Sequence, residues 1–219
     1  MTADEIVEGH KRTAVICGIA WDISEHKRTE VRLRYRATHD TLTGLPNRAL
    51  LMDRLKQAMR SADRDGQRLG VLFLDLDSFK QVNDDLGHEA GNEVLRQLGV
   101  RLCQRVRASD TVARYGGDEF VLLQPGLNRA SDCERGVRML GEVLREPFTI
   151  AGRRLHIAAS VGVALYPDDG KDAEALLCVA DSDMYAAKKT AGSSDASGIR
   201  RRLRSATGHE NPGCRIPPA

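Results

Sequence analysis

The chain has 219 residues, of which 41% are hydrophobic and 29% charged, and a formal net charge of +2. This length accommodates one domain of ordinary size with flanking segments and a sizeable core. The tail from residue 193 onward carries five Arg against two acidic residues, so the rest of the chain has a net charge of −1. That balance argues against nucleic acid as a partner of the domain.

The five cysteines are far apart and include no CxxC pair: Cys17, Cys103, Cys133, Cys178 and Cys214. An odd number of isolated thiols is typical of a reducing compartment and argues against a disulfide framework or a zinc site. No apolar run approaches the length of a membrane span, and the acidic N-terminus lacks the apolar segment of a signal peptide. We therefore expect the chain as given to be cytoplasmic and to contain no membrane span.

The N-terminal segment is too short to form a domain of its own. Residues 13–21 form an apolar run that predicts one strand, and residues 24–38 are dense in charge and predict a linker helix. The pattern resembles the last strand of a PAS sensor domain and the helix that leaves it. We therefore interpret residues 1–23 as the remnant of a PAS domain end. For the linker, a short coiled coil between two protomers and a solvated helix both remain open.

From residue 39 onward, the hydrophobic pattern predicts helices near residues 48–62, 89–107, 130–145 and 173–189. Strands are predicted at residues 69–75, in a hairpin at 110–124 that Pro125 ends, and at 154–158 and 160–166. This order indicates an α/β (α+β) fold with one mainly antiparallel sheet and helices packed on it. Residues 191–219 have no apolar periodicity and are predicted to form a disordered basic tail.

Carboxylates occur at two positions where strands are predicted to meet. The apolar run of residues 69–74 fits a strand buried on both faces, and Asp75 follows it at the strand end, where ligands of α/β sheets tend to bind. The hairpin of residues 110–124 has a glycine pair at its tip, with Asp118 and Glu119 at the start of its second strand. On neighbouring strands, Asp75 and Asp118 would form a hard-oxygen site that suits Mg²⁺. The alternative is a solvated acidic turn.

These segments resemble the GGDEF-type diguanylate cyclases. Five motifs in register carry the resemblance: DTLTGLPNR at 40–48, DLDSFKQVND at 75–84, GHEAGN at 87–92, RYGGDEF at 114–120 and ADSDMYAAK at 180–188. The resemblance implies a GGDEF domain over residues 39–190, with a nucleotidyl-cyclase, palm-like fold and a ferredoxin-like central sheet. It also implies the condensation of two GTP into cyclic di-GMP and two pyrophosphates, by attack of a ribose 3′-hydroxyl on an α-phosphate.

The family pattern further implies a metal site at the two acidic segments. Asp75, Asp118 and the carbonyl of Leu76 match metal-ligand positions for Mg²⁺, with Mn²⁺ as the alternative. Glu119 matches a metal ligand or proton acceptor. The expected catalytic residues are Asp118, Glu119 and Lys80.

Six residues match positions that bind the substrate in the family: Ser78, Phe79, Lys80 and Lys188 at the phosphates, and Asn83 and Asn92 at the guanine edge. Two departures from the family pattern matter. The family has Asp at position 92, and an amide has one acceptor oxygen where a carboxylate has two, so we expect reduced affinity or selectivity for guanine. An arginine that the family carries after Lys188 is missing. For Arg114, phosphate binding and support of the hairpin both remain open.

The segment RASD at residues 107–110 matches the RxxD site through which the family's product inhibits the enzyme. Arg107 would pair with a phosphate or stack on guanine, and Asp110 would accept hydrogen bonds from the base. Arg138 is a second expected contact. Ordinary helix-end charges are the alternative.

The sequence thus predicts a diguanylate cyclase with GTP as substrate and cyclic di-GMP as product and inhibitor. A homodimer is expected to be needed for catalysis, because one site cannot align both nucleophiles. The first rival is a catalytically weak GGDEF module that binds GTP or cyclic di-GMP as a signalling receptor. The second rival is an inert fragment of a larger sensor protein.

Overall fold

The structure is a computed structural model that describes residues 3–8, 11–16, 32–33, 35–190 and 199–200. The chain divides into two compact units, Met1–Tyr35 and Arg36–Ala219. The predicted basic tail lies almost entirely outside the described residues, as does most of the predicted linker helix. Among the helices that the structure describes, none combines the length and the apolar character that a membrane crossing demands.

The first unit contains a two-stranded antiparallel hairpin. Strand β1 (Ala3–Glu8) pairs with β2 (Lys11–Ile16), with Glu8 opposite Lys11 and Ala3 opposite Ile16. The strand predicted over residues 13–21 begins earlier, at Lys11, its partner β1 was not predicted, and residues 17–21 lie outside the described part. A strand needs a partner for its backbone groups, and here the acidic N-terminal segment supplies it. The assignment of residues 1–23 to a PAS domain stays a prediction.

The second unit is built on one sheet, in which the strands follow the order β4-β5-β3-β8-β9. The pairs β4–β5, β5–β3 and β3–β8 are antiparallel, and the short β9 pairs with β8 in parallel. The strands are β3 (Arg68–Leu76), β4 (Thr111–Gly116), β5 (Glu119–Leu127), β8 (Ala159–Tyr166) and β9 (Ile199–Arg200). The predicted, mainly antiparallel sheet is confirmed.

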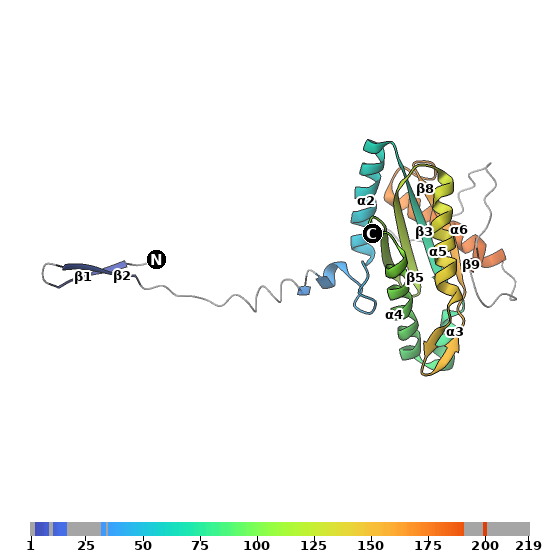
Figure 1. Cartoon of the computed structure of the whole chain (residues 1–219), viewed down its shortest axis with the longest axis horizontal. Helices are drawn as coiled ribbons and strands as arrows, with labels where there is room; N and C mark the ends of the chain where they lie inside the picture. Colours follow the sequence, from blue (N-terminus) through green and yellow to red (C-terminus); the bar gives the residue numbers. More distant parts are fainter. Residues whose placement is uncertain (1–2, 9–10, 17–31, 34, 191–198, 201–219) are drawn as a thin grey trace. The chain divides into compact units, whose positions relative to one another are not determined.

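Helices cover both faces of this sheet, as Figure 1 shows with α5 in front and α6 behind. Alternate residues of β3 point to opposite faces. Leu72 and Leu74 pack in a core with α4 and α5, whereas Val71 and Phe73 pack in a core with α2 and α6. Burial on both faces explains the uninterrupted apolar run of β3. The helices are α2 (Arg48–Asp65), α3 (Phe79–Leu86), α4 (His88–Arg105), α5 (Glu134–Arg145) and α6 (Ala173–Thr190).

Two details of the strands differ from the predictions. Pro125 does not end β5, which continues to Leu127 because a bulge opposite Arg68 and Gly70 accommodates the proline. The strand predicted at residues 154–158 is β7 (Arg153–Leu155), which pairs with an unpredicted strand β6 (Phe148–Ile150). Strands of three residues are too short to show an alternating pattern.

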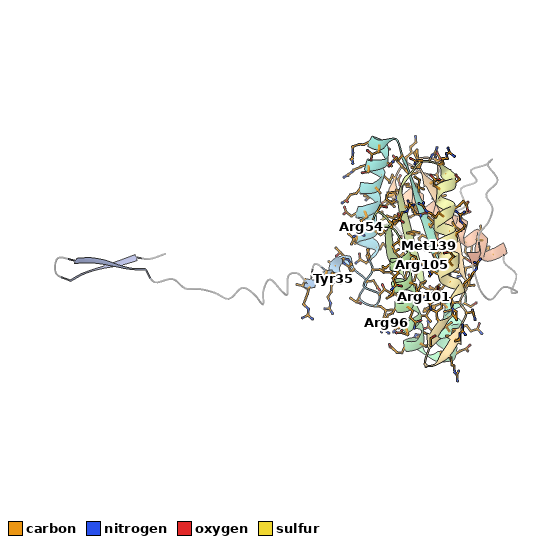
Figure 2. All side chains as sticks on the ribbon, in the orientation of Figure 1. Tyr35, Arg54, Arg96, Arg101, Arg105 and Met139 are labelled. Atoms are coloured by element: carbon orange, nitrogen blue, oxygen red, sulfur yellow. The ribbon has the colours of Figure 1, made fainter. Side chains whose placement is uncertain are left out.

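Arginines of α4 fix the corner between α5 and β6. The Arg101 guanidinium donates to the carbonyls of Glu146 (2.6 Å) and Pro147 (2.7 Å) and lies over the Phe148 ring. Arg105, one turn further along, pairs with Glu142 and Glu146. Figure 2 labels both arginines beside Met139 of α5. A cation at the C-terminus of a helix is favourable, so this corner holds α4 and α5 together as one layer.

Candidate functional site

A cleft of about 390 Å³ lies between α3, α4 and the turn that joins β4 to β5. Five predicted site residues line it: Phe79, Lys80, Asn83, Asn92 and Asp118. It is also lined by residues that the sequence analysis did not select: Asp84, His88, Leu95 and Gly117. All of these except Leu95 lie inside the quoted motifs, which is the signal that could have found them. The structure thus brings segments from distant parts of the chain to one concave surface.

The predicted acids meet beside this cleft. Asp75 is opposite Glu119 of β5 on one side and Ser160 of β8 on the other. Asp118 lies in the turn one residue before β5 begins, so the prediction that it starts the strand was wrong by one residue. Its carbonyl accepts a hydrogen bond from the Leu76 N–H at 3.4 Å, which places the turn against the end of β3. Register partners share a face, so Asp75 and Glu119 point to the same side of the sheet.

That side is covered by α6, whose Lys188 Nζ contacts Asp75 Oδ1. Burial and three neighbouring carboxylates raise the pKa of Glu119 to about 7; the neighbours are Asp75, Asp181 and Asp118. Burial also raises the pKa of Asp75, against the opposing effect of Lys188. Burial lowers the pKa of Lys188, but its contact with Asp75 outweighs this and leaves it raised. We call the three acids Asp75, Asp118 and Glu119, together with the Lys188 that contacts Asp75, the acidic cluster.

The acidic cluster fits a hard divalent cation by its chemistry. It offers carboxylate oxygens, and the carbonyl of Leu76 lies at the same strand end, which are donor types that Mg²⁺ and Mn²⁺ prefer. Burial and then the neighbouring carboxylates raise the pKa of Glu119, against the opposing effect of Lys188. Within the described part of the chain, no group of three or more His, Cys, Asp and Glu is already close enough together to hold an ion.

A second ionic group holds in place the turn at Gly116 and Gly117 that joins β4 to β5. The Arg114 guanidinium donates to both carboxylate oxygens of Asp40, at 3.0 and 3.1 Å, and to the carbonyl of Gly117 at 2.7 and 3.0 Å. We call these three residues the anchor cluster. Arg114 therefore supports the hairpin in this structure, although it also lines the cleft. Nη1 makes both contacts with Asp40, whereas Nε and Nη2 donate to Gly117, so one guanidinium links the Asp40 loop to the turn.

Asp40 is itself organised by the loop that follows it. Its Oδ1 accepts from the backbone N–H of Thr43 at 2.8 Å and from the Thr43 hydroxyl at 2.7 Å. Burial acts to raise the pKa of Asp40, but the hydrogen bonds from Thr43 and Arg114 overcome it and lower the pKa below its usual value. The sequence analysis quoted this loop for its resemblance but assigned Asp40 no role. Its partner Arg114 is 74 positions away in the chain.

The segment between β3 and α3 is a tight turn of two residues, Asp77 and Ser78. Ser78 adopts a left-handed conformation (φ 57°) at the N-cap of α3, and its carbonyl accepts from the N–H groups of Gln81 and Val82. Asp77, the residue before it, is held by its side chain and by its backbone. Its Oδ1 accepts from the Ser160 hydroxyl, and its N–H donates to the Ala158 carbonyl. This turn carries Lys80 at the surface of the cleft.

The opposite wall holds the two asparagines. Asn83 of α3 approaches the α4 backbone at Gly91 so closely that a Cβ there would lie 2.0 Å from Asn83 Oδ1. Arg96, whose Nη1 donates to Glu89 Oε1 at 3.0 Å, and Asn92 of α4 both lower the pKa of Glu89. Gly91 is thus needed for the position of Asn83, a role that the glycine in the motif did not reveal beforehand.

The predicted inhibitory residues lie apart from this cleft. Arg107 and Asp110 form a turn after α4, in which Arg107 N–H donates to Asp110 Oδ2 (3.2 Å) and Asp110 N–H donates to the Arg107 carbonyl (3.0 Å). The Arg107 side chain is exposed. Arg138 is also exposed, on α5, and no hydrogen bond or ion pair among the described residues joins it to Arg107 or Asp110. Their common function is not tested by these contacts and stays a prediction.

Comparison with known proteins gives the chain its family. The profile described as "Diguanylate cyclase, GGDEF domain" matches residues 37–194. The chain is 48% identical over 152 residues to MucR of Pseudomonas aeruginosa, a bifunctional diguanylate cyclase/cyclic di-GMP phosphodiesterase, covering 69% of this chain and 22% of MucR. It is 41% identical over 160 residues to the diguanylate cyclase TpbB of the same species, covering 73% of this chain and 37% of TpbB. It is 38% identical over 181 residues to the cyclic di-GMP phosphodiesterase PdeR of Escherichia coli, covering 83% of this chain and 27% of PdeR.

Solved structures agree with these relatives. The GGDEF domain of TpbB from Pseudomonas aeruginosa superposes with a TM-score of 0.69 at 41% identity, covering 74% of this chain and 92% of that structure. The coiled coil and GGDEF domain of DgcB from Caulobacter crescentus, solved with c-di-GMP, gives a TM-score of 0.69 at 26% identity, covering 77% of this chain and 89% of that structure. The chain spans less than two fifths of the length of the curated relatives named above. The chain belongs to the GGDEF family of diguanylate cyclase domains.

Proposed function

We propose that this domain is a diguanylate cyclase that condenses two GTP into cyclic di-GMP and two pyrophosphates. The observation that carries the proposal is the cleft in which Lys80, Asn83, Asn92 and Asp118 meet beside the acidic cluster. Phosphoryl transfer depends on alignment and on positive charge around the phosphate oxygens rather than on covalent help from the protein. Family membership and the relatives named diguanylate cyclase support the same activity.

The acidic cluster is the proposed metal site. Asp75, Asp118 and the Leu76 carbonyl would hold Mg²⁺, or alternatively Mn²⁺, with Glu119 as a further ligand or as the proton acceptor. When bound, such an ion lowers the pKa of the attacking ribose 3′-hydroxyl and stabilises the leaving pyrophosphate. The pKa of Glu119, raised to about 7, suits a group that accepts a proton near neutral pH. The anchor cluster would keep the turn that carries Asp118 in a fixed position.

The phosphates and the base are assigned to separate parts of the site. The backbone amides of Ser78 and Phe79 and the Lys80 ammonium would hold the β- and γ-phosphates, because α3 begins there. Lys188 would leave Asp75 and contact a phosphate when nucleotide and metal are bound. The uncharged amides of Asn83 and Asn92 would contact the base at the opposite wall.

Catalysis would require two copies of the chain. A cleft of about 390 Å³ suits a single nucleotide, so each protomer would present one GTP to the other. Cyclic di-GMP would then inhibit through Arg107 and Asp110, with Arg138 as a second contact. The solved complex of DgcB with c-di-GMP supports product binding by a related domain.

An activity assay tests the proposal. Purified protein incubated with GTP and Mg²⁺ should yield cyclic di-GMP, detected by chromatography, and gel filtration over a range of concentrations should show a dimer. Absence of product at every protein concentration would refute the cyclase assignment. Calorimetry with cyclic di-GMP should show binding that Arg107→Ala weakens at least tenfold and that Arg135→Ala, an exposed arginine on α5, leaves unchanged.

A receptor is the second candidate function, and Asn92 is the observation that favours it. Loss of a carboxylate at this position removes one acceptor for guanine, which would weaken substrate binding more than product binding at the separate Arg107 site. A relative named as a cyclic di-GMP phosphodiesterase, PdeR, shows that related domains occur outside dedicated cyclases. Cyclic di-GMP binding without turnover of GTP would identify this function.

A further inference from the structure

Lys188 extends from a helix that is firmly packed on the sheet. It lies in the last turn of α6, between the buried Ala187 and the exposed Lys189. Met184, one turn earlier, is buried in the core that α6 forms with α2 and the sheet. This apolar packing fixes the backbone that carries Lys188, whereas its own stem of four carbons is flexible. The ammonium group can therefore change partners while the helix stays in place.

The Lys188 ammonium uses an oxygen that belongs to the proposed metal site. Its Nζ donates to Asp75 Oδ1. Asp118 and Asp77 are near enough to attract it electrostatically. The Asp75 side chain is only 13% exposed, so solvent screens this contact weakly. Lys188 is thus an internal cation at the acids that would hold a divalent one.

A divalent cation on Asp75 is incompatible with the present position of Lys188. The two cations would share one carboxylate, and like charges at such a short separation repel each other strongly where water is partly excluded. Binding of the metal therefore requires Lys188 to leave Asp75 Oδ1. The Lys188 side chain is 38% exposed, so it has room to turn toward another anion. The proposed function supplies that anion, because a nucleoside triphosphate carries several negative charges.

We propose that Lys188 competes with the divalent cation for Asp75 and that the phosphates of the nucleotide remove this competition by binding Lys188. This inference rests on the proposed function and concerns the order in which the site is filled. Metal binds weakly to the protein alone, and it binds more tightly once a triphosphate holds the lysine. The coupling is reciprocal, so the metal raises the affinity for the triphosphate by the same factor.

Binding of Mn²⁺ without nucleotide tests the competition directly. Electron paramagnetic resonance distinguishes free from bound Mn²⁺, so no turnover is needed. Lys188→Met removes the charge and keeps a long side chain, and the full chain should then bind Mn²⁺ at least about tenfold more tightly than the native protein. The matched control is Lys189→Met. This neighbouring lysine is exposed and lies over the Tyr185 ring, so its loss should leave the affinity for Mn²⁺ unchanged.

The same variant should bind the triphosphate more weakly. The probe is the α,β-methylene analogue of GTP, which cannot release pyrophosphate, titrated by calorimetry at saturating Mg²⁺. Loss of a contact between an ammonium and a phosphate should lower its affinity at least about fivefold in Lys188→Met and leave it unchanged in Lys189→Met. Opposite changes in the two affinities distinguish competition from a structural role, because damage to the fold would lower both.

The possible results separate this inference from the proposed function. Equal or weaker Mn²⁺ binding by Lys188→Met, with binding lost in Asp118→Ala, would overturn the competition and leave the metal site in place. Tighter binding that persists when Asp118→Ala is added to Lys188→Met would place the ion elsewhere and overturn the inference. Absence of Mn²⁺ binding in every variant, with and without the analogue, would refute the metal site and the inference with it. If circular dichroism shows that Lys188→Met folds poorly, Lys188→Gln serves as the second neutral variant.

Discussion

The anchor cluster and the acidic cluster occupy the same end of the sheet and have opposite electrostatic outcomes. In the anchor cluster, Asp40 receives two hydrogen bonds from Arg114, and its pKa is lowered. In the acidic cluster, Asp75 also touches a cation, Lys188, yet its pKa is raised. Both carboxylates are largely shielded, with side-chain exposures of 23% and 13%.

The difference lies first in burial, which raises the pKa of both carboxyl groups but outweighs the opposing contacts only at Asp75, and then in the like charges nearby. Asp40 has one cation and hydrogen-bond donors from its own loop, so its ionised form is fully compensated. Asp75 has one cation, Lys188, and its pKa is raised by burial and, to a smaller extent, by the neighbouring carboxylates of Asp118 and Asp77. A compensated pair stabilises the fold, whereas an uncompensated group stores repulsion that a bound ligand can relieve. The comparison therefore separates an ion pair that supports the hairpin from the group of carboxylates that we propose as the metal site.

The largest effect should come from Asp118→Ala, which breaks the proposed metal site without touching the anchor. Turnover of GTP should fall at least about 1000-fold, because one ligand of the cation is lost. The free energy of unfolding should change by less than about 1 kcal/mol, since the substitution removes like-charge repulsion. A chromatographic assay measures the turnover, and urea unfolding measures the free energy of unfolding. The control is Asp85→Ala, an exposed acid on α3, which should leave both unchanged; turnover near the native rate in Asp118→Ala would contradict the metal assignment.

Arg114→Ala should act mainly on stability, with a loss of about 2 to 3 kcal/mol in the free energy of unfolding. The substitution leaves the Asp40 carboxylate without its partner and the Gly117 carbonyl without its donor. Urea unfolding measures the change. Arg96→Ala serves as the control, because its partners Glu89 and Glu93 are 80% and 43% exposed and such surface pairs contribute less than about 0.5 kcal/mol. Equal losses in the two variants would remove the distinction between anchor and surface pair.

Glu119→Gln should stabilise the metal-free protein by about 1 kcal/mol at pH 8 while abolishing turnover. Removing a charge that burial disfavours and that its neighbours also repel favours the fold, and partial exposure to solvent limits the gain. Thermal or urea unfolding in the presence of a chelator measures it. Glu174→Gln, which removes an exposed charge on α6, should change stability by less than about 0.5 kcal/mol. Destabilisation by Glu119→Gln would show that the acidic cluster is already compensated.

The sequence predicts the sheet and its covering helices because their signals are local. The apolar run of β3 and the helical spacing of Leu51, Leu55 and Met59 each lie within one element, and both proved correct. The glycine turn was also predicted in place. Strands β1 and β6 were missed, because short strands are defined by the partner they pair with rather than by their own pattern.

The contacts that organise the site could not be predicted from the sequence, for a related reason. Arg114 and Asp40 are 74 positions apart, and Lys188 and Asp75 are 113 apart, so no spacing in the sequence announces either pair. Asn83 and Asn92 were selected through the family resemblance, but the space that Asn83 occupies depends on Gly91 having no side chain. Local patterns thus identify which residues carry the chemistry, and tertiary packing decides what each of them faces.

The smallest and most specific effect should be the pH dependence of the anchor. The folded pKa of Asp40 lies below its usual value of about 3.9, so the stabilisation is fully present above that value and is lost as the pH falls through the folded pKa. Asp40→Asn should therefore be about 1 kcal/mol less stable than the native protein at pH 7, and this gap should shrink at pH 3 and below. Urea unfolding of both proteins over this range measures the gap, with the exposed Asp53→Asn as a control for general effects of acid. A gap that stays constant down to pH 3 would mean that Asp40 acts through its shape and its contacts with Thr43, and that the charge of the anchor contributes nothing to its stability.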